Sequence, residues 1–181
     1  LKNKRNSQYR KTDGFVQWIT FQPSSLNTMV RVGYSVQCLA TEFPNISLLL
    51  GGYIRNKHGA EMWLTPDDMS HFEQTFSSIV DQIKPSLKNE LQLDTILEYL
   101  MSLDMRHADL YLSRGVAYLL NGFTVQGFEN LKRGKQMYEE VDNVWAKNSV
   151  HKISDWIEDE QKIILKIHES IHSGRNILNL K

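Results

Sequence analysis

The stretch from residue 30 to residue 38 reads VRVGYSVQC, and it gives the strongest strand signal in the chain. Its apolar residues fall at every second position, at Val30, Val32, Tyr34, Val36 and Cys38. Successive side chains of a β-strand point to opposite faces of the sheet, so this period of two predicts a β-strand.

Further strand signals stand on both sides of this stretch. The expected strands cover Gln8–Thr12, Phe15–Phe21, Gly51–Arg55 and Ala60–Leu64. Between the first two lies Asp13-Gly14, a dipeptide that favours a two-residue hairpin turn. The last two read as a closing hairpin around residues 56–59.

The pattern changes from strand to helix at Thr65. Thr65-Pro66-Asp67-Asp68 is typical of a helix start, with a Thr cap, a Pro in the first helical position and acids in the first turn. Apolar residues then recur at helical spacing. The expected helices cover residues 65–85, Asp94–Leu103, His107–Asn121, Thr124–Val141 and Val150–His172, with Gly122 and Gly174 as end signals.

Strands followed by helices predict an α+β fold, an N-terminal antiparallel meander packed on a C-terminal helical layer. The 181 residues are 41% hydrophobic and 23% charged, which suits one globular domain. We therefore expect a single domain over residues 1–181, with a sheet portion at 1–64 and a helical portion at 65–181.

Charge and cysteine content narrow the functional classes. The chain has 21 Lys and Arg against 21 Asp and Glu, so no global basic field attracts nucleic acid or an anionic membrane. Its single cysteine, Cys38, allows neither an internal disulfide nor a cysteine-based zinc site. No apolar run is long enough to span a bilayer, and the N-terminus is polar and basic. We expect a cytoplasmic protein.

The segment after residue 107 resembles a tetratricopeptide repeat. Large, small and turn-forming residues stand where that helix pair has them, at Tyr111, Gly115, Tyr118, Gly122 and Leu131. Gly127 and Gly134 replace the small alanines of the repeat, and small residues let a partner helix approach closely. A stable array needs about three repeats and one unit is visible, so an ordinary antiparallel helix pair is the open alternative.

A wider resemblance covers residues 5–103. Its motifs are Ser7-Gln8-Tyr9-Arg10-Lys11, then Ile19-Thr20-Phe21-Gln22, then Trp63 before the Thr-Pro helix start, and Ile96-Leu97-Glu98-Tyr99-Leu100. In this order they resemble a bacterial family of unknown function that begins with a sheet and ends in helices. This sequence lacks the helix that usually precedes the first strand in that family. The resemblance implies a small bacterial cytoplasmic protein that neutralises a toxin or binds another protein.

Residues 168–172 read His-Glu-Ser-Ile-His, a literal H-E-x-x-H motif. On a helix, His168 and His172 would share a face and could bind zinc, with Glu169 as general base. A catalytic zinc needs a third protein ligand, yet residues 173–181 contain no His, Asp, Glu or Cys. A zinc metallohydrolase is therefore the alternative hypothesis.

The main hypothesis is a non-enzymatic protein-binding module without a cofactor, specifically an immunity protein that neutralises a toxin. If the helix pair is repeat-like, its first helix presents Asp109, Ser113 and Arg114 outward. Asp155 and Asp159 would add an acidic surface that attracts a basic partner such as a nuclease toxin. These five residues form the predicted partner-binding surface, and the expected partner is a protein rather than a nucleic acid or a membrane.

Overall fold

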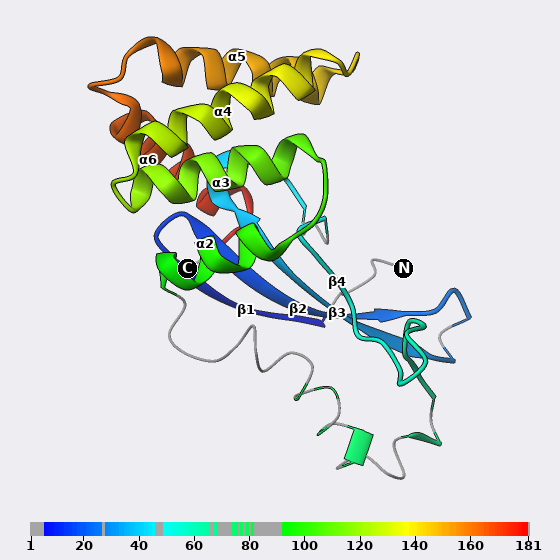
Figure 1. Ribbon diagram of the computed structural model, residues 1–181. Coiled ribbons are helices and arrows are strands. Elements are labelled where there is room, and N and C mark those ends of the chain that lie inside the picture. Colours follow the sequence, from blue (N-terminus) through cyan, green and yellow to red (C-terminus); the bar gives the residue numbers. More distant parts are fainter. Residues whose placement is uncertain are drawn as a thin grey trace. The chain divides into compact units, whose positions relative to one another are not determined.

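The computed structural model describes residues 6–26, 28–45, 49–65, 67–68, 74–75, 77, 79, 81 and 92–180. It confirms the α+β class, because an N-terminal antiparallel sheet precedes five helices between residues 93 and 177 (Figure 1).

The sheet has the strand order β1-β2-β3-β4, with β5 also paired to β3. The strands are β1 (Asn6–Thr12), β2 (Phe15–Pro23), β3 (Val30–Cys38), β4 (Gly51–Tyr53) and β5 (Trp63–Leu64). Gly14 adopts a φ of 98°, which only glycine reaches easily, so the predicted turn between the first two strands is confirmed. The alternating stretch at 30–38 forms β3 over its whole length.

The expected hairpin at 51–64 forms, but its arms pair with β3 as well as with each other. Within the hairpin, Arg55 and Glu61 make an antiparallel bridge. On β3, Gly33 lies opposite Tyr53 and Arg31 lies opposite Trp63, so β4 and β5 follow successive parts of the same strand. Residues 54–62 therefore lie in a hairpin that leaves the edge of the sheet after β4 and returns to the same strand, β3, at β5.

The chain divides into two compact units whose boundary differs from the predicted one at residue 64. The first unit combines residues 6–10 with the described residues of 17–36 and 47–91, and the second combines residues 11–16, 37–45 and 92–180. The first pair of β-strands thus contributes residues to both units. The expectation of one domain stays a prediction.

In the first unit, the side chains of Val32, Ile54 and Ile79 form the buried cluster. Ile19, Tyr34, Met62 and Leu64 pack against that cluster. At the expected helix start, the Thr65 amide and hydroxyl both donate to the Asp68 carboxylate at 2.7 Å. Most of the expected helix at 65–85 lies outside the described residues.

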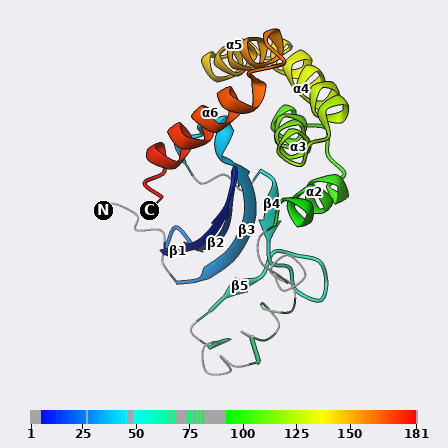
Figure 2. The same ribbon diagram turned by 90° about the vertical axis from the view of Figure 1, so that its left-hand side faces the viewer.

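The second unit contains the described helices. They are α2 (Leu93–Ser102), α3 (Ala108–Leu120), α4 (Thr124–Glu139), α5 (Val144–Glu158) and α6 (Ile163–Ile177). The helices α2, α3, α4 and α5 follow one another as packed neighbours, which the end-on view shows most clearly (Figure 2). The last helix packs on the short 3-10 helix η1 (Leu39–Thr41).

Two expectations about the last helix are wrong. A single helix was expected over Val150–His172, but the chain breaks at residues 159–162 and forms α5 and α6. An unbroken helix would place Glu160 near the buried apolar stripe, whereas the break leaves it exposed. The break also shifts the helical register, so that Ile163 is buried and Ile164 is exposed.

Gly174 does not end α6 but lies inside it, where it permits a close approach. A Cβ atom at this position would lie 2.0 Å from the Leu39 carbonyl oxygen, closer than any van der Waals contact allows. The glycine therefore lets α6 contact the backbone of η1 directly. By contrast, Gly122 has a φ of 81° between α3 and α4, and its predicted role in the turn is confirmed.

Candidate functional site

The α3–α4 hairpin is held together at two glycines that face each other. A Cβ atom on Gly115 would lie 2.7 Å from a Leu131 methyl group, and one on Gly127 would lie 2.5 Å from Leu119 Cγ. Each glycine thus accommodates a leucine of the opposite helix, as the spacing in the sequence predicted. The two helix backbones can approach closely only because these side chains are absent.

A partly buried hydrogen bond joins the open end of this hairpin. The Tyr138 hydroxyl, on α4, donates to Asp109 Oδ1, on α3, at 2.7 Å. Burial, followed by the Asp109 charge, raises the pKa of Tyr138, so the phenol stays protonated and keeps donating. The His107 ring nitrogen Nδ1 accepts a hydrogen bond from the Asp109 backbone amide and thereby caps α3. The hairpin is therefore fixed at both its middle and its end.

A cleft of about 410 Å³ lies on this hairpin, between α4 and the loop that leads into α3. It is lined by Arg106, Lys132, Arg133, Gln136, Met137 and Glu140. Its size is in the range of ligand-binding clefts, which are about 300–1,000 Å³.

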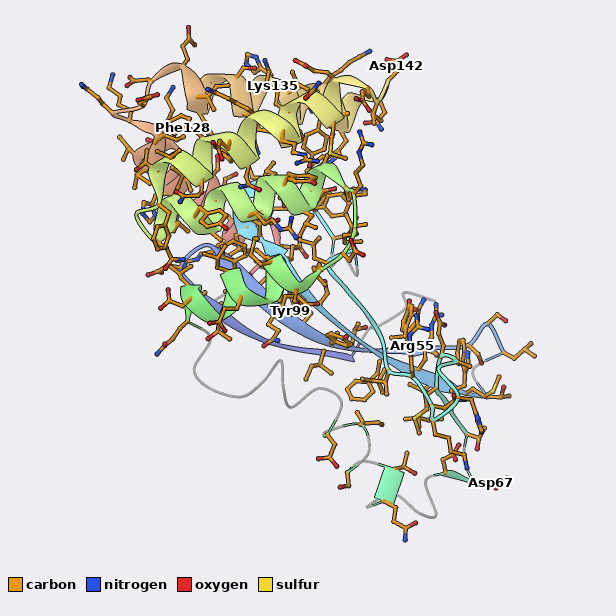
Figure 3. All side chains as sticks on the ribbon, viewed as in Figure 1. Arg55, Asp67, Tyr99, Phe128, Lys135 and Asp142 are labelled. Atoms are coloured by element: carbon orange, nitrogen blue, oxygen red, sulfur yellow. The ribbon has the colours of Figure 1, made fainter. Side chains whose placement is uncertain are left out.

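Three of the lining side chains are cations that remain uncompensated. Within the described part of the chain, Arg106, Lys132 and Arg133 form no ion pair. The Arg133 guanidinium lies 4.6 Å from the centroid of the Tyr111 ring, which supports it from α3. Lys135, which is labelled in Figure 3, lies on the same helix but pairs with Glu139 at 3.3 Å and does not line the cleft.

The prediction that Ser113 points outward from α3 is wrong, because its side chain is fully buried. Eight of the 13 residues of α3 are buried, so position 113 packs into the helical layer rather than facing outward. Asp109 is half-buried and is already bonded to Tyr138.

Arg114 also has a structural partner, since it caps the end of α2. Its guanidinium donates to the Leu100 carbonyl at 2.8 and 3.0 Å and to the Leu103 carbonyl at 3.0 Å. The last carbonyls of a helix have no partner within it, so a side chain that binds them stabilises the helix end.

The predicted acidic surface carries charges that are already paired. Asp155 binds Lys166 at 2.8 Å, and Asp159 binds Lys162 at 3.0 Å. The hydrogen bond from Lys162 lowers the pKa of Asp159, and the bond to Asp155 raises the pKa of Lys166. A lysine therefore lies beside each carboxylate and weakens the field available to a basic partner.

The H-E-x-x-H residues lie on α6 as the motif predicts. His168, Glu169 and His172 are all exposed, on the side of the helix away from the buried Ile167 and Ile171. Nowhere among the described residues do three His, Cys, Asp or Glu side chains gather as a metal site would require. Within that part of the chain, no third ligand lies close enough to bind a zinc ion together with His168 and His172.

The sequence reasoning missed the cleft, although a signal for it was present. Lys132, Gln136 and Glu140 follow one another at four-residue intervals, and Arg133 and Met137 lie one position beyond. This spacing places them on a single face of a helix. The signal from Arg106 was weaker, because its place beside that face depends on how α3 pairs with α4.

No protein-family model matches the chain, and no curated protein or solved structure shows significant similarity to it. The resemblances to a tetratricopeptide repeat and to a bacterial family of unknown function therefore stay predictions. No helix in the described ranges is both long and apolar enough to cross a membrane.

Proposed function

We propose that this protein is a non-enzymatic protein-binding module that docks its partner on the α3–α4 hairpin. The observation that carries the proposal is the cleft on this hairpin, with its three uncompensated cations. Charged groups exposed in a cleft remain available for pairing with a partner, whereas charges already paired within the chain do not.

The framework around the cleft supports this role. The Gly115–Gly127 contact and the Asp109–Tyr138 hydrogen bond hold the two helices in one arrangement. A surface that is ordered before binding loses less conformational entropy when its partner docks. The hairpin therefore suits recognition by preformed side chains.

The chemistry of the lining favours binding over catalysis. The six lining side chains include no hydroxyl or thiol nucleophile and no histidine. They offer positive charge, one amide, one thioether and one carboxylate. Guanidinium, ammonium and amide groups bind and orient a charged ligand readily, so this lining supports a binding role.

The experiment that tests the proposal is site-specific photo-crosslinking in the cells that produce the protein. A benzophenone amino acid replaces the exposed Gln136 in the cleft, and in a matched control it replaces the exposed Lys57 in the β4–β5 hairpin. We expect one protein to be captured through position 136 and not through position 57. Failure to capture any protein above the position-57 background would contradict the proposal.

The narrower hypothesis is an immunity protein whose partner is a basic toxin that docks on Asp155 and Asp159. Both residues are accessible, but the lysine beside each weakens the support for it. If the captured protein is basic, its association should slow when both aspartates are changed to Lys, and more so at low salt. An unchanged association rate would remove this acidic surface from the account.

A further inference from the structure

The cleft is elongated along α4. Five of its six residues lie on that helix or at its C-cap, at positions 132, 133, 136, 137 and 140. At 1.5 Å per residue, the distance along the helix from Lys132 to Glu140 is about 12 Å. An extended peptide covers about 3.3 Å per residue, so the strip matches roughly four residues of a bound chain.

Cations stand at both ends of this strip. Lys132 and Arg133 occupy the end nearer the middle of α4. The Asp109–Tyr138 hydrogen bond shows that the start of α3 lies beside the end of α4. Arg106, just before α3, therefore reaches the strip near Met137 and Glu140.

The strip is positive although the chain as a whole is neutral. Three cations face one carboxylate in the cleft, while the complete sequence has 21 residues of each sign. Arginine guanidinium groups bind carboxylates through two parallel hydrogen bonds, which gives geometric specificity as well as affinity. The complementary ligand thus carries carboxylates near both ends of a short segment.

Nucleic acid and free phosphate fit this strip less well. A protein that makes about 6–10 phosphate contacts to a nucleic-acid backbone needs a similar number of cations. The cleft offers three cations, and it also contains the carboxylate of Glu140, which would repel a phosphate. Phosphate sites commonly use free backbone N–H groups at a helix N-terminus or in a loop. Lys132 to Met137 lie within α4, where those groups are engaged in the helix itself.

We propose that the cleft binds an acidic segment of the partner protein, in which two Asp or Glu residues flank an apolar residue that covers Met137. This inference rests on the proposed function and names the chemistry of its partner. The carboxylates pair with Arg106 at one end and with Lys132 and Arg133 at the other.

Two variants isolate the charge of the cleft. The cleft variant carries Arg106→Gln, Lys132→Gln and Arg133→Gln. The control variant carries Lys11→Gln, Lys57→Gln and Lys147→Gln, three exposed cations that do not line the cleft. Both lose the same charge, and glutamine keeps a helix propensity close to that of lysine and arginine. Circular dichroism checks that each variant is folded.

The test is selection from a phage library of random peptides of about twelve residues, long enough to overlap the strip in several registers. Binding to the wild type and to the control variant should enrich clones with two acidic residues about three or four positions apart. The cleft variant should not enrich them. A synthetic winning peptide should bind the cleft variant at least about tenfold more weakly, as expected when charge-assisted hydrogen bonds are lost.

The outcomes separate the two proposals. Enriched clones that need the cleft but lack acidic residues would overturn the acidic partner and leave protein binding intact. Release of the winning peptide by about 10 mM inorganic phosphate, which barely changes ionic screening at physiological salt, would show a small-anion site and also overturn it. Equal enrichment on the cleft variant, or no enrichment at all, would remove the cleft as a docking site.

Discussion

The Ser113 hydroxyl is buried within α3 and has no hydrogen-bond partner among the residues that the structure describes. An unpaired buried hydroxyl costs about 1–3 kcal/mol, and alanine also has a higher helix propensity than serine. Ser113→Ala should therefore raise the free energy of unfolding by roughly 1 kcal/mol. Urea unfolding followed by circular dichroism measures this change.

The control for this substitution is Ser35, a buried serine on β3 whose hydroxyl donates to the Val36 carbonyl at 3.2 Å. Ser35→Ala should lower the free energy of unfolding by about 1 kcal/mol, because it removes a hydrogen bond that is made. If Ser113→Ala also destabilised the protein, its hydroxyl would have a partner and the placement of Ser113 would be wrong.

The Cys38 thiol lies at the end of β3, almost completely buried. Burial raises its pKa to about 12, so the folded protein holds almost no thiolate near pH 8. Since the thiolate is the nucleophile, we expect iodoacetamide to leave Cys38 unmodified in the native protein and to modify it fully in urea. Mass spectrometry measures the modified fraction.

The same burial makes stability depend on alkaline pH. Below the unfolded pKa of about 8.5, both states hold the proton and the thiol has no effect. As the pH rises from there toward 12, the unfolded chain ionises first, so the native state loses stability over this window. Rapid modification of native Cys38 at pH 8 would contradict its burial.

At the scale of elements, Gly174 tests the contact between α6 and η1. Its missing Cβ leaves room for the Leu39 carbonyl, which a methyl group would meet at 2.0 Å. Alanine is better than glycine by about 1 kcal/mol in a free helix. Overpacking against a backbone costs more, so Gly174→Ala should lower the free energy of unfolding by roughly 2 kcal/mol.

Ser173→Ala, one position earlier on the same helix, is the control for this substitution. It should change stability by no more than about 0.5 kcal/mol, as is usual away from a close contact. Chemical unfolding of the two variants side by side decides the matter. A gain in stability for Gly174→Ala would show that α6 does not approach η1 this closely.

The elements most accurately predicted were those with strong local signals. The alternation of residues 30–38 and the glycine turns at Gly14 and Gly122 depend only on neighbours in sequence. The break between α5 and α6 could not be predicted in this way, because apolar residues continue at helical spacing across it. The break leaves Glu160 exposed, whereas a continuous helix would bury it. This difference depends on how the helix packs and not on the local sequence.

The candidate site was harder to predict than the fold. Asp109 and Arg114 were expected to bind a partner because a repeat-like helix would present them outward. Each instead binds a group of its own chain, Tyr138 or the carbonyls at the end of α2. Helical spacing shows which residues share a face, but it does not show which face a neighbouring element covers.

At the scale of the molecule, the chain is neutral and its charges are unevenly distributed. Asp155 and Asp159 each pair with a lysine, while the three cations of the cleft form no ion pair among the described residues. Exposed ion pairs contribute little to stability. We propose that the uncompensated charges of the cleft bind the partner.

The most direct test measures the affinity of the captured partner for the wild type, the cleft variant and the control variant by isothermal titration calorimetry. The account predicts that the cleft variant binds at least about tenfold more weakly, since it loses the groups that pair with the partner. It also predicts that the control variant stays within about twofold of the wild type, because distant exposed charges matter little. Equal loss of affinity in both variants, or no loss in the cleft variant, would contradict it.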